Sequence, residues 1–171
     1  LASSPVHMSG FTKESAGWLS YVDGELDKEY SLTALERQSA GGTVLRFDDP
    51  NSNNPNHYYI VEARESATAY GAPESGVVIY QVTWDAHAQN PHHVVNAMGA
   101  QQGSTMGTGP GNRAYARPTL RGAASPGTPN SWKSPSRRLD FQLIRESTAD
   151  GYSATVRVVQ YDPANLVGAV A

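Results

Sequence analysis

The chain has no cysteine among its 171 residues, which excludes disulfide frameworks, thiolate zinc sites and cysteine nucleophiles. The redox compartment stays open, because many exported proteins hold together without disulfides. No apolar run reaches the roughly eighteen residues that a membrane-spanning helix needs, so no membrane span is expected. The formal net charge of -3 leaves no basic excess, and nucleic acid is therefore not expected as a partner.

Turn-forming residues are plentiful instead. The chain carries 16 glycines and 11 prolines, and hydrophobic residues make up 39%, somewhat less than in an ordinary globular chain. Many turns favour an all-β plan over a helical bundle. From residue 84 to residue 136 the composition shifts to Gly, Pro, Ser, Asn and Gln, which predicts a long irregular loop.

The remaining segments predict one short helix followed by about seven strands. Ser4, Ser9 and Thr12 are candidate N-caps, and Gly17 is a natural stop, so a short N-terminal helix is expected before residue 17. Runs rich in β-branched and aromatic residues predict the strands. These runs span residues 18–22, 29–35, 43–47, 57–65, 76–83, 138–145 and 152–160.

The pattern of these strands favours an antiparallel β-sandwich. Residues 58–61 and 77–80 are continuous apolar runs, which predicts central strands buried on both faces. Asp150 and Gly151 predict a hairpin turn between the last two strands. The sequence therefore predicts a mostly β fold, a sandwich of about seven strands, with a closed barrel as the alternative.

Glu62 and Arg64 are the first candidate site residues. They lie two apart on a predicted strand, so their side chains point to the same face, where a carboxylate and a guanidinium can pair. Their apolar neighbours argue against a cleft that would admit a substrate. The sequence therefore favours a structural ion pair.

One candidate metal site lies at the start of the predicted loop. Asp85, His87, His92 and His93 place a carboxylate and three imidazoles close together in the sequence, a ligand set that suits transition ions. Two adjacent histidines diverge on an extended chain, however. Solvated loop histidines are the alternative interpretation.

A second candidate metal site precedes the first central strand. Asp49, Asn51 and Asn53 alternate oxygen ligands as the start of a calcium loop does. The helix-loop-helix pattern then fails, because Asn54 stands where it needs glycine and Ile60 where it needs a bidentate glutamate. The sequence leaves two readings, an irregular calcium loop or a polar turn.

Four segments in a fixed order carry a resemblance to a known family. They are residues 5–19, with Lys13 and Gly17-Trp18-Leu19, residues 58–64, residues 75–82 and residues 151–156. Together they resemble the region that follows the zinc ligands in secreted metallopeptidases of the immune inhibitor A type. In that family the Lys and Gly-Trp element closes the catalytic domain and the Tyr-Tyr strand begins a β-rich region. An acidic residue usually ends the later Gly-apolar-Tyr strand, and here Asp85 is displaced from that position.

The resemblance implies a division of the chain and a function. Residues 1–20 are expected to be the terminal helical piece of a catalytic domain, and residues 21–171 a β-sandwich domain containing the loop 84–136. The chain lacks the His-Glu-x-x-His motif that a zinc peptidase needs, so no cofactor is expected on this chain and zinc is expected only in an upstream domain. Leu1 is interpreted as a processed or trimmed end.

Two functions remain open at this point. The chain is expected to be the non-catalytic C-terminal part of a secreted metalloendopeptidase, packing against an upstream catalytic domain and stabilising it. The alternative is an extracellular structural, adhesion or glycan-binding module with another extracellular protein as its partner. Both interpretations place the protein in a secreted or extracellular location.

Overall fold

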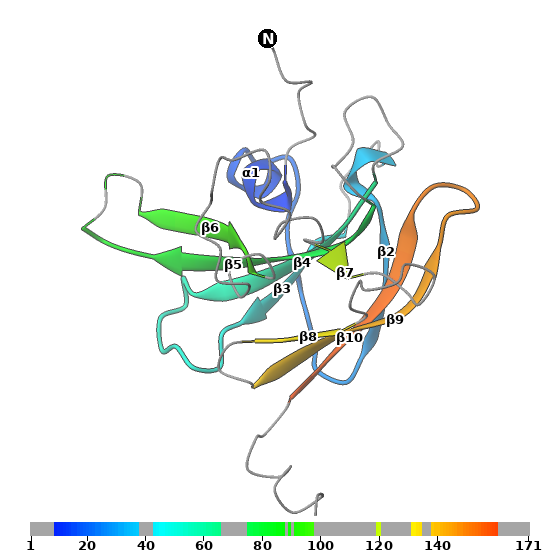
Figure 1. Ribbon diagram of the computed structural model, residues 1–171. Coiled ribbons are helices and arrows are strands. Elements are labelled where there is room, and N and C mark those ends of the chain that lie inside the picture. Colours follow the sequence, from blue (N-terminus) through cyan, green and yellow to red (C-terminus); the bar gives the residue numbers. More distant parts are fainter. Residues whose placement is uncertain are drawn as a thin grey trace, which may run out of the picture.

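The computed structural model describes residues 9–37, 43–65, 75–87, 89, 91–97, 119–120, 131–134 and 138–160. Within these residues two β-sheets pack face to face, and a short helix covers the outer side of one of them (Figure 1). The predicted mostly β, sandwich-like fold is thus confirmed. The described strands form two separate sheets, not one closed barrel.

The helical elements in the described part of the chain are α1 (Gly10–Ser15) and the 3-10 turn η1 (Leu35–Arg37). The strands are β1 (Val22–Asp23), β2 (Glu29–Thr33), β3 (Leu45–Asp48), β4 (Tyr58–Arg64), β5 (Gly76–Trp84), β6 (His92–Asn96), β7 (Thr119–Leu120), β8 (Ser131–Lys133), β9 (Leu139–Ser147) and β10 (Ser153–Gln160). Sheet A has the order β1-β3-β4-β5-β6, with β7 paired to β5, and sheet B has the order β2-β10-β9-β8. All pairs are antiparallel except β1 with β3.

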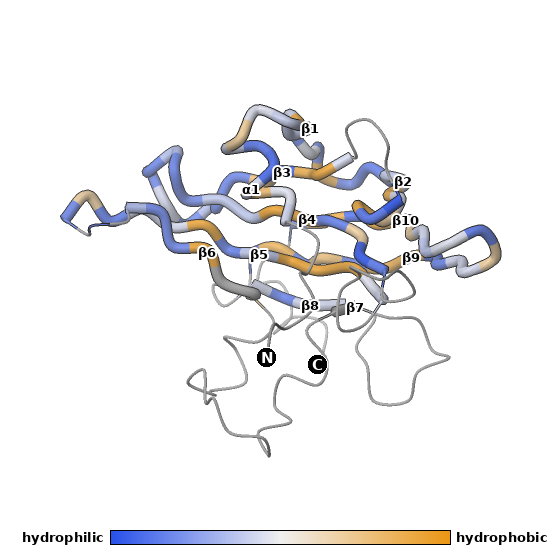
Figure 2. Tube along the Cα trace, turned by 90° about the horizontal axis from the view of Figure 1, so that it is seen from above, coloured by the Kyte–Doolittle hydropathy of each residue, from blue (hydrophilic) through white to orange (hydrophobic). Residues whose placement is uncertain are grey.

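The main core lies between the two sheets. Phe141 of β9 contacts three aromatic rings, with centroid distances of 5.4 Å to Tyr59, 5.5 Å to Trp132 and 6.0 Å to Phe47. Figure 2 shows the hydrophobic residues concentrated along β4 and β5, with polar residues in the turns. Alternate residues of β10 are buried, and Ala154, Val156 and Val158 face this core.

A second, smaller core covers the outer face of sheet A. Leu19, Leu35 and Ile60 are buried in it, and Phe11 of α1 packs against it from above. Every residue of β4 is buried, because one face of the strand meets sheet B and the other meets α1 and η1. The two-sided burial predicted from the continuous apolar run is confirmed.

Helix α1 has a well-defined start and end. The Ser9 hydroxyl accepts a bond from the Thr12 amide, so Ser9 is the N-cap. At the other end Gly17 takes a φ of 74°, and the amides of Gly17 and Trp18 donate to the carbonyls of Glu14 and Lys13. These two bonds form the Schellman motif that lets a glycine stop a helix.

No helix in the described ranges is long and apolar enough to cross a membrane.

The range predicted as one long loop contains three strands. Strand β6 pairs with the second half of β5, and a bond from the Asp85 amide to the Pro91 carbonyl closes their hairpin. Strands β7 and β8 pair with β5 and β9. These three short strands form their backbone hydrogen bonds with neighbouring strands, and no pattern in their own residues predicts that pairing. Within that range, residues 88, 90, 98–118, 121–130 and 135–136 lie outside the described residues.

Two predicted strands have other bounds in the structure. Residues 18–21 are not a strand, and only Val22–Asp23 pairs, in parallel with β3. Trp18, whose amide belongs to the Schellman motif, is 62% exposed. Strand β2 stops at Thr33, and Leu35 begins η1 instead of extending the strand. The described residues form ten strands where about seven were predicted.

Candidate functional site at the junction of α1 and β4

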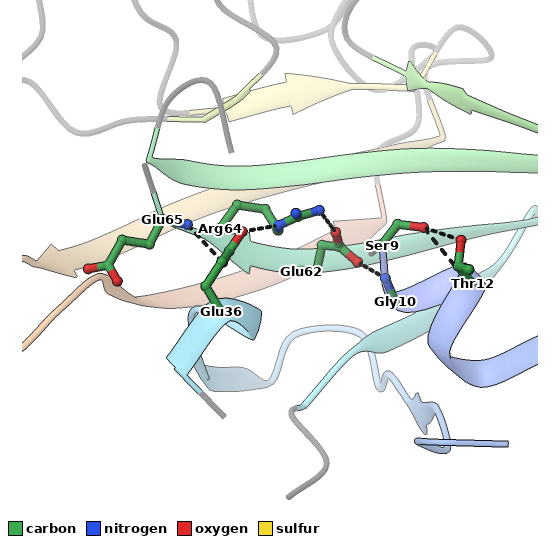
Figure 3. Close-up of polar contacts among 7 residues, drawn as sticks. All are labelled: Ser9, Gly10, Thr12, Glu36, Glu62, Arg64 and Glu65. Carbon is green, nitrogen blue, oxygen red and sulfur yellow. Dashed lines mark hydrogen bonds and ion pairs between the residues drawn. The ribbon is translucent and has the colours of Figure 1, made fainter. Parts of the chain in front are cut away.

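The candidate site is a cluster of charged side chains buried between β4, η1 and α1 (Figure 3). Glu62 and Arg64 lie on the outer face of β4, where strand alternation places both side chains on one side. The Arg64 Nη1 donates to Glu62 Oε1 at 3.0 Å. Glu62 is 0% exposed and Arg64 3%, so this pair lies in the interior.

Glu36 of η1 supplies a second carboxylate to the same guanidinium. The Arg64 Nε donates to Glu36 Oε1 at 2.7 Å, and the Glu65 amide donates to Glu36 Oε2 at 3.0 Å. The side chains of Arg64 and Glu36 are 4% and 1% exposed. Sequence reasoning missed Glu36, because it lies 28 residues from Arg64 and nothing in its neighbourhood sets it apart.

Helix α1 closes the cluster. The Gly10 amide donates to Glu62 Oε2 at 2.7 Å, so both oxygens of this carboxylate are occupied (Figure 3). A Cβ on Gly10 would lie 2.7 Å from that oxygen and 2.7 Å from a methyl of Val44. Position 10 therefore has no room for a side chain, and the helix can approach β4 this closely only with glycine there.

Burial and the opposite charges act against each other in this cluster. Burial raises the pKa of Glu62, and the neighbouring Arg64 and the Gly10 amide oppose that rise. Burial opposes the charged form of Arg64 too, yet Glu62 and Glu36 together raise its pKa. Burial, followed by repulsion from Arg64, lowers the pKa of Lys13, which stands on the α1 side of the cluster.

A neighbouring carboxylate ties the two sheets together. Glu65 follows β4 directly, and its Oε1 accepts a bond of 2.8 Å from the Tyr152 amide at the start of sheet B's hairpin strand. Its Oε2 accepts a bond from the Nε of Arg37. Gly151, with a φ of 89°, lets the chain turn beside Arg37 at this point.

The arrangement favours a structural role over catalysis. Glu62, Arg64 and Glu36 are buried and already bonded to one another, so a substrate could reach them only after α1 had left the sheet. Removing one member of a buried ion pair is costly, because the partner is left as an uncompensated charge. The cluster can therefore act as a brace that holds α1 and η1 onto β4.

The candidate transition-metal ligands do not converge. Asp85 and His87 share one exposed turn, where Asp85 Oδ1 accepts a bond of 2.9 Å from the His87 amide. His92 and His93 point to opposite faces of β6, as adjacent strand residues must. The His92 ring contacts Trp84 at 4.6 Å and Phe11 at 5.6 Å, and His93 is exposed.

The candidate calcium residues form a hydrogen-bonded turn. Asp49 Oδ1 accepts bonds from the amide and the side chain of Asn51, at 3.0 and 3.1 Å. Ser52 Oγ lies 2.8 Å from His57 Nδ1, which closes the loop ahead of β4. Asn53 is exposed. The side chains of this turn thus cap its own backbone.

In the part of the chain that the structure describes, no three His, Asp or Glu side chains lie close enough together to hold a metal ion. Comparison with known proteins adds no assignment, since no family model, curated protein or solved structure matches the chain.

Proposed function

We propose that this chain is the non-catalytic C-terminal β-sandwich portion of a secreted metalloendopeptidase, and that it packs against the catalytic domain and stabilises it. The resemblance of residues 5–19, 58–64, 75–82 and 151–156 to that family supports the proposal. Residues 5–8 of this set lie outside the described residues. Zinc would be held by the upstream domain, and calcium remains a second candidate ligand at Asp49, Asn51 and Asn53.

The observation that carries the proposal is the brace between α1 and β4. A six-residue helix cannot be stable alone, yet α1 is fixed by a cap, by Phe11 in the outer core and by the Gly10 bond to buried Glu62. A domain joined to the N-terminal side of α1 would therefore be held close to sheet A.

Breaking the brace in the full natural protein tests this function. Arg64→Met leaves Glu62 and Glu36 buried without their cation, which should destabilise the sandwich by about 3–5 kcal/mol. We expect the temperature at which casein hydrolysis is lost to fall together with that of sandwich unfolding. Arg145→Met is the matched control, because its pair with Glu29 is exposed and contributes little.

Two results would contradict the proposal. One is chelator-sensitive casein cleavage by residues 1–171 alone. The other is an Arg64→Met protein whose sandwich unfolds early while casein hydrolysis keeps its native temperature profile.

A second candidate is an extracellular structural, adhesion or glycan-binding module. The exposed side chains of Trp18, Val22 and Leu26 favour it, since they present apolar surface to a partner. The reading frame upstream of Leu1 distinguishes the candidates. A His-Glu-x-x-His helix there supports the peptidase, whereas a further sandwich or a surface anchor supports the module.

A further inference from the structure

We propose that a two-part groove at one end of the sandwich binds an extended peptide segment that carries a basic side chain and an apolar side chain two residues apart. We call it the end groove. Its polar half is lined by Asp23, Gly24, Arg46 and Asp48. Its apolar half is lined mainly by Leu26, Phe47, Pro50 and Leu139. The end groove does not involve the brace between α1 and β4, so this inference is independent of the proposed function.

The polar half is a hollow of about 460 Å³ with a fixed guanidinium in its wall. Parallel pairing of β1 with β3 sets Asp23 beside Arg46. The Arg46 Nη2 donates to Asp48 Oδ1 at 3.2 Å and to the Pro55 carbonyl at 2.7 Å, and its guanidinium lies 4.1 Å from the centre of the Tyr58 ring. Arg46 is therefore pre-organised, and it positions Asp48 in turn.

The charge around this half favours a cationic ligand. Segments 23–28 and 46–49 carry five acidic residues against two basic ones. Lys28 is already paired with Glu25 at 3.1 Å, and Arg46 with Asp48. The Asp23 side chain belongs to an exposed residue of β1 and lines the hollow. A lysine or arginine side chain complements this field, whereas an acidic ligand would be repelled.

The apolar half adjoins the polar half, because Gly24 and Asp48 line both hollows. It has a volume of about 230 Å³, and Phe47 and Leu139, which are 4% and 3% exposed, belong to the core beneath it. Leu26 is 40% exposed at its edge. An apolar side chain placed here would remove Leu26 from water, which favours binding.

Gly24 lies where the two halves meet. A Cβ at this position would lie 2.1 Å from Cζ of Phe47, so the backbone lies directly against the aromatic ring. The Gly24 amide donates to the Arg46 carbonyl at 2.8 Å, which fixes this backbone to β3. Glycine at this position lets the backbone pass from Asp23 to Leu26 in direct contact with the Phe47 ring.

An extended peptide matches both halves at once. Alternate residues of an extended chain point to the same side, so a basic residue and an apolar residue two positions apart can enter the two halves together. A metal ion or a small amine would use only the polar half. A neutral glycan would gain nothing from the negative field.

Fluorescence anisotropy with a labelled glycine-serine peptide that carries arginine, one spacer and leucine tests the assignment on the whole chain. Replacing the arginine by glutamate, or the leucine by serine, should weaken binding at least about fivefold. Asp23→Asn and Leu26→Ser should each weaken it by a similar factor. Both residues are exposed, so the variants should unfold at the native temperature.

Matched controls distinguish binding at the end groove from a general attraction of the basic peptide to an acidic protein surface. Asp150→Asn removes an exposed carboxylate at the β9–β10 turn, and Val22→Ser removes an exposed apolar side chain outside the groove. Both variants should bind as the native chain does. The proposal is overturned if Asp150→Asn weakens binding as much as Asp23→Asn, if the leucine-free peptide binds equally well, or if the arginine peptide does not bind.

Discussion

At the residue scale, the most costly feature of the molecule is the set of charges beneath α1. A buried carboxylate loses its hydration, and the loss is offset only where donors surround both oxygens. Glu62 meets this condition, with Arg64 on one oxygen and the Gly10 amide on the other. Apolar residues could fill the same space without that cost. The charged set instead makes the position of α1 depend on one specific pairing.

The contribution of Glu62 to the free energy of unfolding should fall as the pH rises. Burial raises the pKa of Glu62 above its ordinary value of 4.5, so the folded state binds this proton more tightly than the unfolded chain does. The contribution is complete below pH 4.5 and is lost as the pH passes the folded pKa. Glu62→Gln stays neutral at every pH, so its urea-unfolding free energies should fall less than those of the native chain as the pH is raised above 4.5.

Glu25→Gln, which makes the same chemical change at the surface, is the control. The Glu25 side chain is 71% exposed, so its replacement should change the free energy of unfolding little. Parallel curves for the native chain and Glu62→Gln would contradict the assignment of the titrating group.

At the scale of the element, α1 shows how a short helix is held in place by its surroundings. Six residues give few internal hydrogen bonds, and nucleation of an isolated helix is unfavourable. The Ser9 cap and the Schellman motif at Gly17 satisfy backbone groups at both ends. Phe11 then buries part of its ring in the outer core. The helix therefore depends on its fit to sheet A.

Gly10→Ala should test that fit directly. The new methyl would be 2.7 Å from both Glu62 Oε2 and Val44, so α1 would have to move outward. Overpacking of this kind costs about 1–3 kcal/mol, even though alanine is the better helix former. Urea unfolding measures the loss. Ser15→Ala, at an exposed position of the same helix, is the control and should be close to neutral, and equal losses in the two variants would contradict the close packing.

At the scale of the whole molecule, aromatic packing and the Glu65 carboxylate join the two sheets. Phe141 extends from β9 between Tyr59 and Phe47 of sheet A. At the hairpin end, Glu65 accepts the Tyr152 amide and so connects the end of β4 to the chain entering β10. The sandwich is thus fixed at its centre and at one end.

Phe141→Ala should therefore weaken the whole sandwich. Phe141 is 1% exposed, and a buried phenylalanine replaced by alanine typically costs about 3–5 kcal/mol through lost burial and the cavity left behind. Thermal and urea unfolding measure the change. Val159→Ala, on the half-buried outer face of β10, should cost much less, and a similar loss in both variants would show that Phe141 does not join the sheets.

Local patterns determined much of the scaffold. The apolar runs around Tyr59 and Ile79 predicted two central strands, and these are the neighbouring strands β4 and β5. The turn at Asp150 and Gly151 predicted the hairpin that joins β9 to β10. Ser9, one of three candidate N-caps, and Gly17 are found at the ends of α1. In each case the residues that carry the sequence pattern are the same residues that form the strand, the turn or the cap.

The remaining features depend on segments that meet only in the folded chain. Gly10 and Glu62 are 52 residues apart in the sequence, and Glu36 and Arg64 are 28 residues apart. The cluster that they form therefore could not be predicted from a local sequence pattern. Strand β6 exists because β5 offers a free edge, and the end groove exists because β1 lies parallel to β3. The sequence alone determined which segments are strands, caps and turns, because those depend on near neighbours. The tertiary structure decided which charges pair and where surfaces open, because those depend on contacts across the sheets.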